Sequence, residues 1–374
     1  MRQTCVSKAK RIVVKVGSAV ITTDTGRLDR ARLAAIVEEI ASLKARDYQV
    51  MLVTSGAIAA GLERLGLEER PTAIPDLQAA ASVGQGLLIQ QYTGLFEKHE
   101  IHVGQVLLTQ YDITHREHYV NAANTFEKLL DFGVVPIVNE NDTTVVEEIK
   151  FGDNDTLAAL VTNLSKADAL VIMSDIDGLH TADPRKHDGT QLLSEVAEIT
   201  PAIESLAGGA GTAFGSGGMV TKLNAAKIVT LAGAGMFLID GRADAALVAA
   251  MNGDDVGTFF APRGRKMTSR KAWIAFGTVA KGTITVDDGA KEAMIAKGKS
   301  LLPAGVTSVA GLFTDGDMVE ITDAAGELIA RGLVDFAAED LAKIKGMTSE
   351  EIHKSHKELY GREVVHRDCL VILK

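Results

Sequence analysis

The chain has 374 residues, enough for two domains with a large core in at least one of them. Charged residues make up 24% and hydrophobic residues 46%, which is ordinary for a globular protein in water, and the net charge of −10 argues against a surface built to bind nucleic acid or membrane. Cys5 and Cys369 lie at opposite ends of the chain and form no metal-ligand or disulfide pattern. Because the N-terminus has no apolar signal core and no apolar run reaches about 18 residues, we expect a cytoplasmic protein.

Short β-branched runs alternate with helical patterns from residue 11 onward. Residues 11–16 predict a buried strand and residues 29–46 an amphipathic helix. Further strands are predicted at 49–53, 103–108, 134–138, 169–173 and 236–239, with helices between them. Such alternation requires crossover connections, so we expect an α/β domain with a largely parallel sheet sandwiched by helices, and ligands beyond the carboxyl ends of its strands.

The pattern changes near residue 261. Residues 262–275 predict a basic linker, and residues 276–374 contain short β-like runs separated by turn signals. We therefore expect a catalytic domain over 1–261 and a smaller, mostly β domain with a C-terminal tail over 276–374. Residues 271–374 hold 16 acidic and 13 basic side chains, which argues against a nucleic-acid footprint there.

A glycine-rich turn at 215–218 runs directly into a helix predicted from Met219 to about Ala232. Glycines let the backbone approach a ligand closely, and the free N–H groups of a helix's first turn favour a phosphate. Thr221 and Lys222 fall in that first turn. The segment predicts a phosphate site, with a flexible surface loop as the alternative.

Three strand ends upstream carry polar side chains. Lys15 interrupts an apolar strand, where a buried ammonium is costly unless an anion meets it; the alternative is a lysine that reaches solvent at the strand end. Ser55 follows the strand at 49–53, and Ser174 with Asp175 follows the strand at 169–173. Taken alone, these two segments are also compatible with plain turns.

The segment from Asn139 to Asp155 is dense in acidic and amide side chains, with nine of them. One of the residues 153–155 is expected to cap the helix that follows. Capping needs a single residue, so the density indicates a further role. Carboxylates and amides together suit the ammonium group of an amino acid, or lysines that must be held apart.

The nine histidines lie outside these loops. A hydroxyl that accepts a phosphoryl group usually needs a general base, whereas a carboxylate with a pKa near ~4.3 is already ionised at pH 7. An ionised carboxylate acceptor is, however, repelled by the negatively charged phosphate, since two unit charges 4 Å apart interact by about 4 kcal/mol at an effective dielectric of 20. Lysines, Mg²⁺ and helix N-termini can offset that repulsion, and Lys15 and Lys222 at glycine turns would supply part of what is needed.

Taken in order, these segments resemble the amino-acid kinase family, and the end of the chain is similar to a PUA domain. Within the family, the chain resembles most the members that phosphorylate the side-chain carboxylate of L-glutamate to L-glutamyl 5-phosphate, the first step of proline biosynthesis. The segments that carry the resemblance are 14–18, 53–61, 138–142, 150–155, 174–175, 181–185 and 215–222, with 284–289, 300–303 and 365–368 in the second domain.

The resemblance implies roles for particular residues. Lys15 and Lys222 would contact the phosphates as catalytic residues, and Asp155 would hold the two lysines in place. Glutamate would be bound by Ser55, Asp142 and Asn154. The nucleotide-binding set implied is Lys15, Ser174, Asp175, Ser216, Gly217, Gly218, Met219, Val220, Thr221 and Lys222.

The resemblance also implies ATP and Mg²⁺, with no metal ligand assigned to the protein. It implies a homo-oligomer (dimer or tetramer), feedback inhibition by L-proline, and hand-over of the product to glutamyl phosphate reductase, with no membrane or nucleic-acid partner. Two alternatives stay open: a kinase of the same family acting on aspartate or N-acetylglutamate, and an RNA-binding regulatory protein, because PUA domains elsewhere bind RNA.

Overall fold

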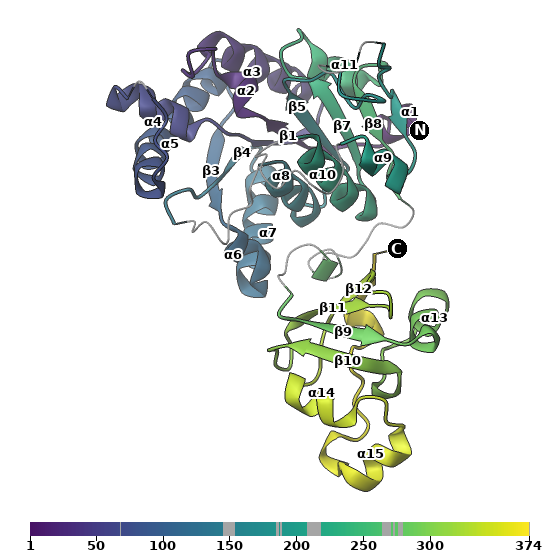
Figure 1. Ribbon diagram of the computed structural model, residues 1–374. Helices are drawn as coiled ribbons and strands as arrows, with labels where there is room; N and C mark the ends of the chain where they lie inside the picture. The colour runs from purple at the N-terminus through teal and green to yellow at the C-terminus, as the bar shows by residue number, and fades with distance from the viewer. Residues whose placement is uncertain are drawn as a thin grey trace. The chain divides into compact units, whose positions relative to one another are not determined.

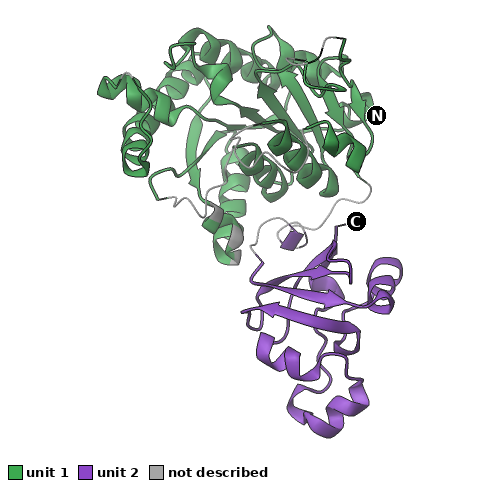
Figure 2. Cartoon of the chain, viewed as in Figure 1, with its two compact units in different colours: residues 1–266 green, residues 267–374 purple. Residues whose placement is uncertain are grey.

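A computed structural model describes residues 1–67, 69–144, 154–184, 187, 189–207, 218–263, 271, 274–275 and 280–373 (Figure 1). The chain divides into two compact units, Met1–Lys266 and Met267–Lys374 (Figure 2). Each unit has a separate hydrophobic core. Across the described residues, every helix is too short or too polar to span a membrane.

The described part of the first unit is built on an eight-stranded sheet in the order β3-β4-β2-β1-β5-β7-β8-β6. All neighbouring strands are parallel except β7 and β8, which run antiparallel. The strands are β1 (Arg11–Val16), β2 (Gln49–Val53), β3 (Val103–Leu108), β4 (Val135–Glu140), β5 (Ala169–Ser174), β6 (Glu195–Val196), β7 (Gly235–Asp240) and β8 (Thr258–Phe260). The expected α/β class with a largely parallel sheet is confirmed.

Helices cover both faces of this sheet (Figure 1). They are α1 (Arg2–Val6), α2 (Ser18–Ile21), α3 (Arg30–Lys44), α4 (Ala57–Leu65), α5 (Ile74–Glu97), α6 (Gln110–Thr114), α7 (Arg116–Asp131), α8 (Asn154–Leu164), α9 (Pro201–Ser205), α10 (Met219–Leu231) and α11 (Ala246–Asn252).

The alternation of side chains along β1 assigns Lys15 to one face of the sheet. Ile12, Val14 and Val16 belong to the core cluster that also contains the apolar side chains of α3, α5 and α11. Successive residues of a strand point to opposite faces, so Lys15 points to the other face. There its ammonium meets α8, whose side chains from Leu157 to Leu164 are all buried. The strand β1 therefore places the Lys15 side chain against the first turn of the buried helix α8.

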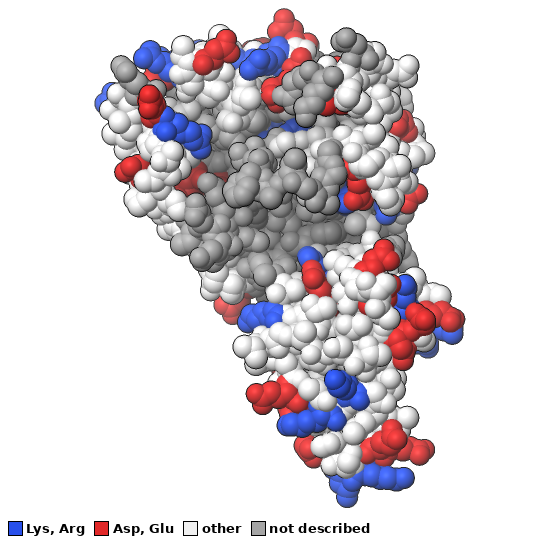
Figure 3. All heavy atoms as spheres, viewed as in Figure 1, with Lys and Arg blue, Asp and Glu red and all other residues white. Residues whose placement is uncertain are grey.

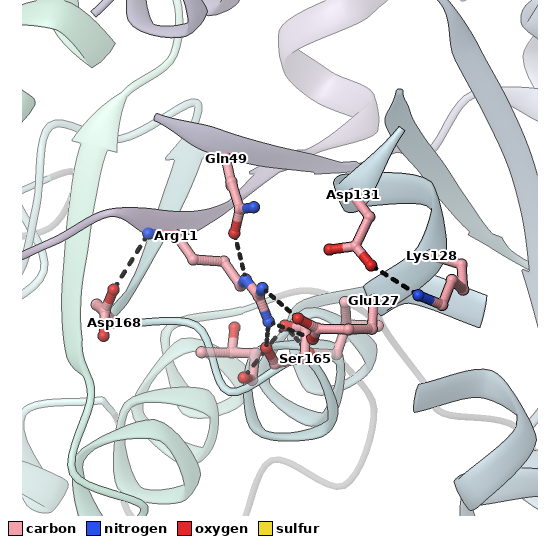
Figure 4. Close-up of polar contacts among 9 residues, drawn as sticks. Arg11, Gln49, Glu127, Lys128, Asp131, Ser165 and Asp168 are labelled. Atoms are coloured by element: carbon pink, nitrogen blue, oxygen red, sulfur yellow. Dashed lines mark hydrogen bonds and ion pairs between the residues drawn. The ribbon is translucent and has the colours of Figure 1, made fainter. Parts of the chain in front are cut away.

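A polar network fixes the opposite, amino end of β1 (Figure 4). The guanidinium of Arg11 donates to both carboxylate oxygens of Glu127 on α7, at 2.9 and 3.1 Å, and to the Ser165 carbonyl just after α8. Its Nε donates to Gln49 on β2 at 2.9 Å, and the Arg11 backbone N–H donates to Asp168 at 3.1 Å. Because a bidentate arginine–carboxylate pair is geometrically specific, the network fixes α7 and the α8–β5 connection relative to β1.

The described part of the second unit contains a five-stranded sheet in the order β10-β9-β11-β12-β13, in which β9 and β11 are parallel and the other pairs antiparallel. The strands are β9 (Gly282–Val286), β10 (Val306–Gly311), β11 (Met318–Thr322), β12 (Leu328–Leu333) and β13 (Leu370–Ile372). The helices are α13 (Asp288–Lys297), α14 (Ala338–Ile344), α15 (Ser349–Ser355) and the short 3-10 turns η2 (Pro303–Gly305), η3 (Lys357–Leu359) and η4 (Arg367–Cys369). The expected smaller, mostly β unit is confirmed.

The predicted strands at 11–16, 49–53 and 103–108 have those limits in the structure, and the other three differ by one or two residues at an end. The strands β6 and β8, which are two and three residues long, are not predicted by the sequence pattern. Strands this short carry too few residues to show a period. The basic linker lies largely outside the described residues, so its conformation stays a prediction.

Candidate active site

A cavity of about 390 Å³ lies at the carboxyl ends of the central strands. This is where a parallel α/β sheet is expected to bind its ligand. Its lining comes from the carboxyl ends of β1, β4 and β5, from the segments after β1, β2, β4 and β5, from the first turns of α4, α8 and α10, and from the connection between α4 and α5. The lining residues are Lys15, Gly17, Ser18, Ala19, Val20, Ser55, Gly56, Ala57, Ile58, Ala59, Arg70, Asn139, Glu140, Asp142, Asn154, Ser174, Asp175 and Lys222.

A buried carboxylate joins two lysines beside this cavity. Asp155, in the first turn of α8, has no exposed surface, and its Oδ1 pairs with the Lys15 ammonium. Its Oδ2 lies 3.1 Å from the Lys222 ammonium and accepts from the Thr221 hydroxyl at 3.2 Å. The lysines are themselves only 5% and 4% exposed. One carboxylate thus holds two ammonium groups at the cavity wall.

The net charge of this triad is positive, because two ammonium groups face one carboxylate. Burial alone would raise the pKa of Asp155, but the charges and hydrogen bonds of Lys15 and Lys222 outweigh it and hold the pKa below its ordinary value. Asp155 is therefore ionised at neutral pH. Two ammonium groups at the cavity wall make this end of the cavity suited to an anion.

Asn154 is the centre of a hydrogen-bonded group next to the triad. Its Nδ2 lies 2.8 Å from the Thr54 carbonyl, 2.8 Å from the Ser55 hydroxyl and 3.1 Å from Asn139 Oδ1. The Asn139 amide in turn donates to Gln85 of α5 at 2.8 Å. As an acceptor from Asn154, the Ser55 hydroxyl keeps its own proton to donate. The network fixes both side chains at the cavity wall before any ligand binds.

Close helix packing positions the turn that carries Ser55. Gly56 has φ = 100°, a left-handed conformation that glycine adopts without a Cβ clash, and it starts α4. On α5, a Cβ at Gly84 would lie 1.8 Å from the Ala57 carbonyl oxygen. A Cβ at Gly61 would lie 1.8 Å from the Ala80 carbonyl oxygen. The backbones of α4 and α5 therefore touch, and α5 supports the start of α4.

The predicted nucleotide segments lie at two neighbouring strand ends. Ser174 ends β5, is 4% exposed, and its hydroxyl donates to Asp175 at 3.1 Å. The helix α10 begins at Met219 after Gly218, so its first-turn N–H groups lie beside Lys222. Both Asp175 and Lys222 line the cavity. The geometry brings the two segments to one site.

The structure brings Lys15, Ser55, Asp142, Asn154, Ser174, Asp175 and Lys222 to this cavity, with Asp155 behind it. Gly218, Met219, Val220 and Thr221 lie in or just before the first turn of α10. Ser216, Gly217 and residues 145–153 of the acid-rich loop lie outside the described residues. The roles of all these residues stay predictions.

Sequence reasoning missed Arg70, Gln85 and the glycine pair Gly61 and Gly84. Arg70 lies in a short connection between α4 and α5 whose sequence does not differ from that of an ordinary polar loop. Its place in the cavity depends on how α4 packs against α5. The glycines sit within helical patterns, where the sequence does not show what lies opposite them.

Within the described part of the chain, no group of three or more His, Cys, Asp or Glu side chains is arranged to hold a metal ion. On the face of the second unit visible in Figure 3, acidic and basic side chains are interspersed.

Known proteins are similar to this chain in sequence and in fold. Residues 10–240 match the amino acid kinase family and residues 282–356 match the PUA domain. A glutamate 5-kinase of Syntrophotalea carbinolica is 46% identical over 374 residues, covering 100% of both chains. One of Carboxydothermus hydrogenoformans is 49% identical over 368 residues, 97% of this chain and 98% of its own. A Giardia lamblia carbamate kinase bound to AMP-PNP has the same fold, with a TM-score of 0.52, 17% identity, and coverage of 68% of this chain and 99% of its own.

Proposed function

The chain belongs to the glutamate 5-kinases of the amino acid kinase family, and we propose that it transfers the γ-phosphoryl group of ATP to the side-chain carboxylate of L-glutamate, the first step of proline biosynthesis. The observation that carries this assignment to named residues is the buried triad of Lys15, Asp155 and Lys222 beside a cavity that also contains Ser55 and Asn154.

The triad suits a reaction between two anions. A carboxylate oxygen of glutamate attacks the γ-phosphorus, the bond from that phosphorus to the β–γ bridging oxygen breaks, and ADP leaves with the electron pair. The acceptor is already ionised, so no proton needs to be removed. Lys15 and Lys222 reduce the repulsion between acceptor and phosphate and stabilise the charge that shifts in the transition state. Asp155 keeps the two ammonium groups close together despite their mutual repulsion.

The side chains that line the cavity next to the triad would bind the two substrates. Asp142 faces the cavity with a carboxylate that suits the ammonium of glutamate, and the preordered hydrogen bonds of Asn154 and Ser55 fix the groups that would hold the rest of it. Ser174, Asp175 and residues 216–222 would bind ATP, with the phosphates at the first turn of α10.

Mg²⁺ fits this site as a companion of the nucleotide. It is usually held by one or two carboxylates and by phosphate oxygens rather than by an all-protein cage. Asp175 lines the cavity with an oxygen donor that could share such an ion. When bound, Mg²⁺ would neutralise part of the phosphate charge.

Three wider properties follow from the proposed reaction and from family membership. An acyl phosphate hydrolyses readily, so transfer to a glutamyl phosphate reductase would protect it. Inhibition by L-proline would limit flux into the pathway at its first step. We propose a homo-oligomer, dimer or tetramer, as the assembled state.

The assignment is tested by trapping the product as a hydroxamate with ATP and Mg²⁺ and a panel of L-glutamate, L-aspartate and N-acetyl-L-glutamate. We expect product with glutamate at a kcat/KM well above that for either analogue. A preference for aspartate or N-acetylglutamate would assign the chain to another carboxylate kinase of the family.

A further inference from the structure

Arg70 is a cation of the cavity for which the phosphoryl transfer gives no role. It lies between α4 and α5, is exposed, and lines the same cavity as Ser55, Asp142 and Lys222. Within the described ranges, no carboxylate forms an ion pair with it. An arginine that lines a ligand cavity with its charge available is suited to bind an anion.

The three cations of the described lining differ in their surroundings. Lys15 and Lys222 are buried and held by Asp155, so their position is fixed at the inner wall. Arg70 is exposed and comes from a surface loop, so it belongs to the outer part of the cavity. The cavity therefore has a fixed cationic end and a separate cationic side chain near solvent.

L-Glutamate has two carboxylates and one ammonium, and the site must distinguish the two carboxylates. The side-chain carboxylate has to reach the buried lysines, because phosphoryl transfer takes place there. The α-carboxylate lies at the other end of the molecule, next to the ammonium. Asp142 provides the opposite charge for the ammonium, and a further cation in the lining of the same cavity would complete the recognition of the α-carbon end.

We propose that Arg70 binds the α-carboxylate of the amino-acid substrate, with its guanidinium fork meeting the two carboxylate oxygens. This inference rests on the proposed function. In this arrangement Arg70 selects free α-amino acids and orients the substrate so that the side-chain carboxylate, rather than the α-carboxylate, faces the lysines. It binds substrate and takes no part in bond breaking.

The test compares L-glutamate with its 1-amide, in which the α-carboxylate is a neutral amide and the side-chain carboxylate is unchanged. Initial rates of hydroxamate formation give kcat/KM for both substrates with the wild type, Arg70→Met and Arg70→Lys. Arg64→Met is the matched control, because Arg64 is an exposed arginine in the last turn of α4 outside this cavity. Circular dichroism establishes that each variant is folded.

We expect Arg70→Met to lower kcat/KM for glutamate on the order of 10- to 100-fold, because the substrate loses a hydrogen-bonded charge partner. The loss should appear as a higher KM, with kcat little changed. The same variant should leave kcat/KM for the 1-amide near its wild-type value, because that substrate has no charge for Arg70 to meet. Arg70→Lys should fall between, since lysine keeps the charge without the fork. Arg64→Met should behave as the wild type.

Unchanged kcat/KM for glutamate in Arg70→Met, an equal loss for both substrates, or a rise in the KM for ATP instead would each overturn the assignment of Arg70. A wild-type protein that fails to phosphorylate glutamate would refute the proposed function itself, and with it the inference. The two failures are distinguished because the first appears only in the variants.

Discussion

The Lys222 ammonium lies 3.1 Å from Oδ2 of Asp155, although the two residues are 67 positions apart and lie in the first turns of different helices. The same carboxylate pairs through Oδ1 with Lys15 at the end of the central strand. The contact therefore fixes three elements, β1, α8 and α10, at the point where their ends meet. A single change at residue 155 should disturb both lysines together.

Replacing Asp155 with Ala should lower both stability and activity. Two buried ammonium groups would lose their shared partner, and breaking a buried ion pair costs about 3–5 kcal/mol. We expect chemical denaturation to show a loss of that order and kcat to fall with it. Glu97→Gln, which changes an exposed carboxylate at the end of α5, is the control and should leave both unchanged. Wild-type stability in Asp155→Ala would contradict the buried triad.

The pKa of Asp155 also predicts a pH dependence. Its pKa is lower in the folded protein than in the unfolded chain, so its contribution to stability is complete above the ordinary pKa of an aspartate. That contribution is lost as the pH falls through the folded-state pKa. The difference in unfolding free energy between wild type and Asp155→Asn should therefore be constant at neutral pH and shrink in acid. A difference that grows as the pH falls would show that the pKa is raised instead.

Lys15→Ala and Lys222→Ala should lower kcat far more than they change the KM for glutamate. Each ammonium is proposed to meet charge that develops in the transition state, and removing one such donor costs on the order of 10²–10³ in rate. Lys227→Ala is the matched control for Lys222, because Lys227 lies on the same helix and pairs with Glu204. Steady-state kinetics with near wild-type kcat in either catalytic variant would exclude the assigned role.

Asp142→Ala and Asn154→Ala should raise the KM for glutamate while the KM for ATP stays close to the wild-type value. A site that pairs with a substrate's polar group loses affinity when that partner is removed. Titrating each substrate at a saturating level of the other separates the two effects. A rise confined to the KM for ATP would mean that the glutamate and nucleotide sites have been assigned the wrong way round.

Gly84→Ala should destabilise the first unit, because the new Cβ would lie 1.8 Å from the Ala57 carbonyl oxygen. Overpacking of this kind costs about 1–3 kcal/mol or more, and a displaced α4 should also raise the KM for glutamate. Gly86→Ala and Gly94→Ala are controls on the same helix with no atom within 4 Å of the new Cβ. There, alanine should be neutral or stabilising by about 0.4–1 kcal/mol. Thermal melts of the three variants should show a lower melting temperature for Gly84→Ala than for the two controls. Equal melting temperatures would refute the close helix contact.

The proposed division of labour between the units stays a prediction and can be tested by truncation. The described lining of the cavity comes entirely from residues 15–222, and the cores of the two units are separate. A chain ending at Ala261 should therefore fold, by circular dichroism, and form hydroxamate from glutamate. A folded but inactive truncation would show that the second unit completes the active site.

Local patterns in the sequence are enough to predict the longer strands and helices and the segments that carry the chemistry. The apolar run from Arg11 to Val16 defined a central strand, and the ammonium of Lys15 within it indicated that an anion must lie nearby, because a buried charge needs a partner. The glycines before Met219 indicated a helix start suited to phosphate. These inferences depend on a few consecutive residues, so they can be made without the fold.

The partner that each of these groups contacts depends on how distant segments pack together in the fold. That Asp155 meets both lysines depends on which face of β1 carries Lys15 and on how α8 and α10 begin beside it. The contact of Gly84 with Ala57 and the place of Arg70 in the cavity depend on the packing of α4 against α5. Such contacts join residues far apart in the chain, and local periodicity does not encode the distances between elements.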